Sequence, residues 1–192
     1  MKAIEILPEG YEEIYSIDLQ KNKKLAVLVN ALSFLILLLM AIPMNYFVPF
    51  SSLFDMKNGL GQYVIRLLSL MGLMILYLVL HELVHGIAMK ICGTKKVKYG
   101  YTGLYAFAGS DDYYSKKPYI FIALAPVVFW GVILAIINFF VSYEWFWVVY
   151  FLQIINVSGA SGDLFVTIKF SFLPKDILVK DYGVAMKVYS KR

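Results

Sequence analysis

The sequence predicts an all-α polytopic membrane protein with about four transmembrane helices. Sixty per cent of the residues are hydrophobic and only 16% are charged, which is too apolar for an ordinary soluble domain. A transmembrane helix needs about 20 predominantly apolar residues. Four stretches reach that length, and they run roughly over residues 25–44, 63–92, 119–141 and 145–168.

The positions of lysine and arginine predict the orientation of these stretches. Basic residues are frequent before the first stretch, between the second and third, and after the fourth, and they are sparse in the other two connections. Basic segments face the cytoplasm. Both termini are therefore expected to be cytoplasmic. The net charge of +5 is a topology signal, and no nucleic-acid partner is expected.

The remaining segments complete a single membrane-embedded domain over residues 1–192. Residues 1–24 form a cytoplasmic lead-in, 25–168 the four-span core, and 169–192 a cytoplasmic tail. The cytoplasmic loop between the second and third stretches contains the glycine-rich segment VKYGYTGLYAFAGS. Glycine and partial alternation of apolar residues favour a short β-hairpin over a helix there.

The chemistry of the chain centres on its two histidines, His81 and His85. They enclose Glu82 in the segment His-Glu-Leu-Val-His, the H-E-x-x-H zinc signature. Residues four apart share a face of a helix, so both imidazoles can reach one metal ion. Glu82 lies beside that face, where it can act as a base on a water molecule. Packing of the histidines without a metal is the weaker interpretation.

A third metal ligand is expected to be a carboxylate, because the chain has no third histidine and catalytic zinc takes three protein ligands. Carboxylates deep inside a span are costly and mark function. With Glu82 assigned as base, Asp163 is the candidate. Its depth matches that of His81 and His85, because all three lie roughly 8–13 Å from the predicted cytoplasmic ends of their spans. Pairing of Asp163 with Asn156 or with the backbone is the alternative.

These motifs resemble two related protein groups. The histidine motif, followed on a later span by Asn156 and Asp163, resembles the site-2 protease group of intramembrane zinc proteases. More closely, the chain resembles a small bacterial family of membrane zincin peptidases, whose members are assigned as peptidases by motif. The matching segments are LPEGYEE, HELVHG, the tyrosine-rich loop that leads to Lys-Pro, LAP and NVSGASGDL.

The resemblance implies a site-2 protease-like core and a set of site residues. His81, His85 and Asp163 would bind Zn²⁺, Glu82 would be the general base, and Asn156 would hold the substrate or the oxyanion. The second motif departs from the site-2 protease pattern, because Gly159 replaces a proline and no glycine follows Asp163. For Asn156, a role in hydrogen bonding between helices is equally open.

The function expected from these features is an intramembrane zinc metalloprotease, with membrane-protein or peptide substrates cleaved near the cytoplasmic face. One alternative is a non-proteolytic zinc-binding membrane interaction module, which would have no need of the base Glu82. Another is a small transporter, but the spans show no internal repeat and the polar residues concentrate in one cluster.

Overall fold

Helices form most of this computed structural model, which describes residues 3–103, 106–183 and 185–191. The long helices are α1 (Lys23–Phe47), α2 (Leu60–Ile91) and α3 (Lys116–Phe140). They are followed by α4 (Phe146–Gly159) and α5 (Ser161–Ser171). Four segments are long and apolar enough to cross a membrane: Lys23–Phe47, Leu60–Ile91, Lys116–Phe140 and Tyr143–Ser171. These segments indicate a membrane protein and agree with the four stretches expected from the sequence.

The fourth stretch contains a break between two helices. α4 ends at Gly159, and Ala160 leaves helical geometry with φ −82° and ψ 17° before α5 begins. Gly159 and Gly162 lie on either side of Ala160, and glycine weakens a helix. Asp163 therefore lies in the first turn of a new helix.

The chain divides into two compact units. The first contains Met1–Val29, Glu82–Pro126 and Gly162–Arg192, and the second contains Asn30–His81 and Val127–Ser161. The boundaries fall inside α1, α2 and α3. A single domain over residues 1–192 stays a prediction.

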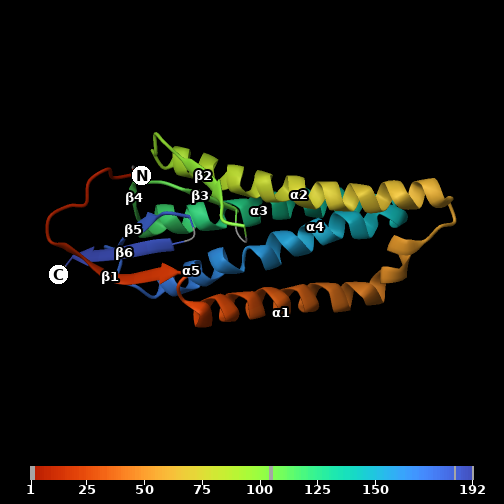
Figure 1. Cartoon of the computed structure of the whole chain (residues 1–192), viewed down its shortest axis with the longest axis horizontal. Helices are drawn as coiled ribbons and strands as arrows, with labels where there is room; N and C mark the ends of the chain where they lie inside the picture. The colour runs from red at the N-terminus through yellow and green to blue at the C-terminus, as the bar shows by residue number, and fades with distance from the viewer. Residues whose placement is uncertain (1–2, 104–105, 184, 192) are drawn as a thin grey trace. The chain divides into compact units, whose positions relative to one another are not determined.

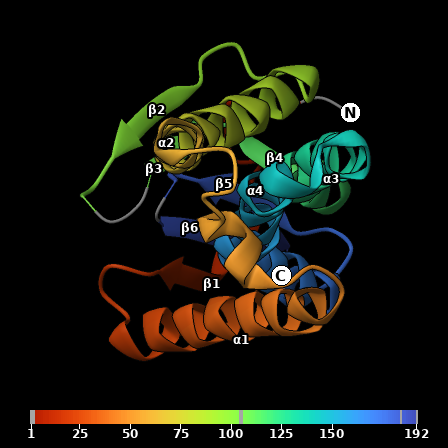
Figure 2. The same cartoon turned by 90° about the vertical axis from the view of Figure 1, so that its right-hand side faces the viewer.

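A four-stranded antiparallel sheet is the main addition to the predicted all-α fold. It belongs to the first unit, and its order is β1-β6-β5-β4. The strands are β1 (Tyr11–Asp18), β4 (Tyr113–Ser115), β5 (Leu178–Asp181) and β6 (Ala185–Lys191). Figures 1 and 2 show β1, β6 and β5 side by side. The lead-in and the tail, predicted as simple appendages, thus pair with each other.

The predicted hairpin is confirmed as the antiparallel pair β2 (Lys98–Tyr101) and β3 (Ala106–Gly109). Residues 104 and 105 between them lie outside the described residues. Tyr99 of β2 packs against α2 at Gly86, where a Cβ atom would collide with the tyrosine hydroxyl. Glycine at position 86 therefore lets the hairpin approach the helix directly after His85.

The core of the first unit joins the sheet to the helix ends. Val179 of β5 and Val188 of β6 are fully buried with Met89 of α2, Ile122 of α3 and Phe170 of α5. Burial of one such side chain stabilises a fold by roughly 1.5–3 kcal/mol. The sheet thus anchors the turns of α2, α3 and α5 that carry site residues.

The second unit has a buried arginine among its apolar side chains. The guanidinium of Arg66 in α2 donates hydrogen bonds to the carbonyl oxygens of Asp55 and Glu144, the latter over 3.3 Å. These carbonyls adjoin the short helices η1 (Phe50–Phe54) and η2 (Tyr143–Trp145). Because a buried charge is costly unless it is paired, these bonds offset the burial of Arg66 and hold both connections against α2.

A buried carboxyl group closes the end of β5. Asp181 is 8% exposed, and it accepts hydrogen bonds from the Tyr119 hydroxyl over 2.8 Å and from the Gly183 N–H over 2.7 Å. Burial raises the pKa of Asp181 from 3.8 to about 6, although the two hydrogen bonds act in the opposite direction. The folded state therefore binds a proton at Asp181 more tightly than the unfolded state does.

This shift predicts how stability depends on pH. The contribution of Asp181 is fully present below its unfolded pKa near 3.8 and is lost as the pH rises through about 6. The change amounts to about 3 kcal/mol. The stability of wild type relative to Asp181→Asn should therefore fall between pH 4 and pH 7, as measured by thermal unfolding in detergent. Asp112→Asn is the control, and parallel pH profiles for wild type and Asp181→Asn would contradict the prediction.

Candidate metal centre

Helix α2 sets the spacing of the two histidines. It continues without interruption from Leu60 to Ile91, so His81 and His85 follow each other by one helical turn and share a face. His85 is buried at 8% exposure, and His81 is half-buried. Glu82 is also half-buried, and its position next to His81 directs it about 100° around the helix. The local geometry expected from the motif is therefore present.

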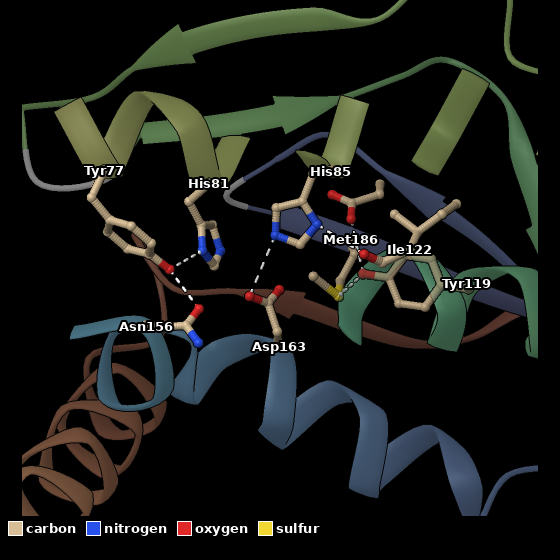
Figure 3. Close-up of polar contacts among 9 residues, drawn as sticks. Tyr77, His81, His85, Tyr119, Ile122, Asn156, Asp163 and Met186 are labelled. Atoms are coloured by element: carbon tan, nitrogen blue, oxygen red, sulfur yellow. Dashed lines mark hydrogen bonds and ion pairs between the residues drawn. The ribbon is translucent and has the colours of Figure 1, made fainter. Parts of the chain in front are cut away.

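Asp163 approaches His85 from the first turn of α5. Its Oδ2 atom lies 3.4 Å from Nε2 of His85, and both residues belong to the first unit (Figure 3). Their side chains are 26% and 10% exposed, so the pair is largely withdrawn from solvent. This contact joins residues from two distant segments of the sequence, and their role as metal ligands stays a prediction.

The three predicted ligands form a group that could hold a metal ion. Candidate ligand atoms of His81, His85 and Asp163 all lie within 4.8 Å of one another. Helical continuity fixes the first two, and the contact with His85 fixes the third. Two imidazole nitrogens and one carboxylate oxygen suit zinc, which in catalytic sites takes three protein ligands and one open position. The residues present therefore fit the metal.

Each histidine uses its Nδ1 atom for a contact within the protein. Nδ1 of His85 lies 3.0 Å from the carbonyl oxygen of Ile122, and Nδ1 of His81 lies 2.9 Å from the hydroxyl of Tyr77. Both contacts engage the Nδ1 side of the ring, so a metal ion would be bound through Nε2. In known metal sites, such partners fix ring orientation and tautomer.

Asn156 lies in α4 and is fully buried. Its Oδ1 accepts a hydrogen bond from the Tyr77 hydroxyl over 2.7 Å (Figure 3). Its Nδ2 donates to the carbonyl oxygen of Val127 over 3.0 Å. The contact of Asn156 with substrate or oxyanion stays a prediction. Tyr77 was missed by the sequence reasoning, although its position four residues before His81 placed it on the same helix face.

The apolar helices indicate a membrane protein, and the histidine–carboxylate group could hold a metal ion. A family model described as "putative zincin peptidase" matches residues 74–178, more than half of the chain. The chain belongs to this family. Membership suggests a zinc metallopeptidase, and the matched region includes His81, Glu82, His85 and Asp163.

A relative from Pyrococcus woesei is 34% identical over 122 residues. It is an uncharacterized 24.7 kDa protein. The match covers 59% of this chain and 51% of the relative, so the chain aligns with about half of that protein's length. No solved structure matches the chain.

The geometry predicts that Asp163 is needed to retain zinc. Asp163→Ala removes the oxygen ligand and should lower the zinc content of purified protein from about one ion per chain to a small fraction, because two ligands hold zinc poorly. Elemental analysis after gel filtration measures this loss. Asp111→Ala, which removes an exposed carboxylate, should retain zinc. Full zinc retention by Asp163→Ala would exclude Asp163 as a ligand.

Proposed function

We propose that this protein is an intramembrane zinc metalloendopeptidase that hydrolyses peptide bonds of membrane-protein substrates near the cytoplasmic face of the membrane. The observation that carries the proposal is the grouping of His81, His85 and Asp163, with Glu82 beside them, on helices apolar enough to span a membrane. Membership in the zincin family supports the same reaction class. A site-2 protease-like arrangement of the core is part of the proposal.

The ligands would be the two imidazoles and the Asp163 carboxylate. Zinc, when bound, supplies Lewis-acid chemistry that lowers the pKa of water and polarises a peptide carbonyl. The ionised ligand Asp163 contributes one negative charge, which suits a divalent cation in a largely buried site. The sheet-anchored ends of α2 and α5 keep these ligands in place.

Glu82 would handle the proton. Its carboxylate takes a proton from the attacking water, the new C–O bond forms at the peptide carbonyl, and the C–N bond breaks as Glu82 returns the proton to the leaving amine. This role needs a carboxylate next to the ligands but not among them. Glu82 meets that requirement because it adjoins His81 in sequence and faces a different direction around α2.

The substrate would be bound in an extended form, because a helix hides its carbonyl groups in its own hydrogen bonds. The hairpin offers a place for it. β2 lies against α2 at Gly86, next to His85, and β2 pairs only with β3 among the described strands. An extended peptide could add to a free strand edge through main-chain hydrogen bonds. We include this mode of binding in the proposal.

The test of the reaction is the variant Glu82→Gln, which keeps the size of the side chain but removes the base. Cleavage should fall by at least about 100-fold, because general acid–base catalysis typically supplies 10²–10⁴-fold. Zinc content should stay unchanged. Comparative proteomics of membrane fragments from cells that express wild type or the variant measures the effect. The exposed carboxylate variant Glu12→Gln is the matched control.

Two results would contradict the peptidase. Normal cleavage by Glu82→Gln would exclude Glu82 as the base. Stoichiometric zinc in the wild type, without any fragment that depends on the protein, would favour a non-proteolytic zinc-binding module.

The proposed orientation has its own test. We place both termini on the cytoplasmic side, on the strength of the lysine distribution. We take the membrane to be a bacterial cytoplasmic membrane, because the chain resembles a bacterial family. A green fluorescent protein fused to either end should be fluorescent, whereas alkaline phosphatase at either end should be inactive. Alkaline phosphatase inserted between α1 and α2, after Lys57, should be active. Active phosphatase at either terminus would contradict the proposed orientation.

A further inference from the structure

The two histidines share a feature that the peptidase motif does not explain. Both direct Nδ1 toward partners that lead to backbone carbonyls of α3. We propose that these two carbonyls fix the ring orientation and tautomer of both histidines, with Pro126, Tyr77 and Asn156 as positioning residues. The consequence for zinc rests on the proposed function, since it assumes that the histidines are ligands.

The first arm starts from Pro126, which lies inside α3 and is fully buried. Proline has no N–H, so the carbonyl four residues earlier loses its helical donor. That carbonyl belongs to Ile122, and Nδ1 of His85 lies 3.0 Å from it. A carbonyl oxygen only accepts, so Nδ1 carries the proton. Pro126 thus releases the acceptor that orients His85.

The second arm is a chain of hydrogen bonds within the second unit. Its direction is set at Val127, whose carbonyl accepts from Nδ2 of Asn156. The amide oxygen of Asn156 therefore faces Tyr77 and accepts its single hydroxyl proton. The hydroxyl oxygen of Tyr77 is then left to accept from Nδ1 of His81. This chain gives His81 the same tautomer as His85.

The space for the second arm is built into α3. A Cβ atom at Gly131 would lie 3.4 Å from Nδ2 of Asn156, so the glycine leaves room for the amide next to the helix. Tyr77 is 5% exposed and Asn156 is 0% exposed. Buried polar groups need partners, and the chain Val127–Asn156–Tyr77–His81 supplies one at each step. Asn156 acts here through Tyr77.

The consequence is the same for both rings. With the proton on Nδ1, each ring can offer only Nε2 to a metal, and in His85 this is the nitrogen that faces Asp163. A histidine with the opposite tautomer would have to rotate or exchange its proton before it could bind a metal. The two arms therefore prepare the ligands before zinc arrives.

The test uses the fact that the chain has only two histidines. Protein labelled with ¹⁵N-histidine gives two imidazole spin systems in detergent micelles, and His81→Gln assigns them. In the metal-free wild type, each Nδ1 should carry a hydrogen-bonded proton that exchanges slowly with water. A wild-type spectrum with the proton on Nε2 alone, or with a rapidly exchanging Nδ1 proton, would overturn the proposal without any variant.

The variants separate the two arms. Pro126→Ala restores an N–H that competes for the Ile122 carbonyl, so the Nδ1 proton of His85 should lose protection while that of His81 is unchanged. Tyr77→Phe and Asn156→Ala should reduce the protection of the Nδ1 proton of His81 and leave that of His85 unchanged. The matched controls are Pro43→Ala, another proline inside an apolar helix, and Tyr150→Phe, whose hydroxyl donates to the Met40 carbonyl. Neither control should change the protection of the Nδ1 proton in either histidine.

A change of both rings in every variant would indicate a general loss of structure and would overturn the assignment of separate arms. Unchanged protection of His85 in Pro126→Ala would overturn the first arm, and unchanged His81 in Tyr77→Phe would overturn the second.

Zinc affinity gives the second readout. Competition with a chelator should show binding about tenfold weaker in Pro126→Ala and in Tyr77→Phe, as expected when the partner of a metal-ligating histidine is removed. A zinc affinity equal to that of the wild type in both variants would contradict the positioning role. If the wild type holds zinc without peptidase activity, the proposed function fails while these results still stand. If the Nδ1 protons are absent or exchange rapidly in the metal-free wild type but cleavage persists, only this inference fails.

Discussion

The contact between His85 and Asp163 is the interaction on which the site depends. It joins α2 to the first turn of α5, segments separated by more than 70 residues, inside a largely apolar environment. A carboxylate and an imidazole in such surroundings are costly unless they face each other or a metal ion. The sheet and the core around Met89 and Phe170 hold the two helix ends at this distance. The arrangement therefore links the stability of the first unit to the geometry of the ligands.

Much of the site was accessible from the sequence because its rules are local. The spacing of His81 and His85 fixes their common face as soon as the segment is a helix. Asp163 could be found because carboxylates are rare in apolar spans, and its expected depth matched that of the histidines. Its contact with His85 does not require an unbroken fourth helix.

What the sequence could not provide are pairings between distant segments. β1 and β6 pair Tyr11 with Lys191, and each strand on its own is a short mixed stretch that a prediction assigns to a lead-in or a tail. The partner of a strand is set by tertiary packing, for which short-range patterns give no signal. Tyr77 illustrates a different gap. Its spacing from His81 was visible, but only the placement of Asn156 shows that its hydroxyl has a partner on each side.

Proline in α3 connects these observations. A proline inside an apolar helix leaves one carbonyl without its helical donor, and membrane proteins tolerate this where a neighbouring group supplies a replacement. For Ile122 the replacement is the imidazole of His85. The cost of the broken helical bond is thereby offset by a bond that also orients a ligand. The apparent defect at Pro126 and the metal motif on α2 then form one structural feature, because a regular helix at position 126 would keep the Ile122 carbonyl engaged and leave Nδ1 of His85 to compete for it.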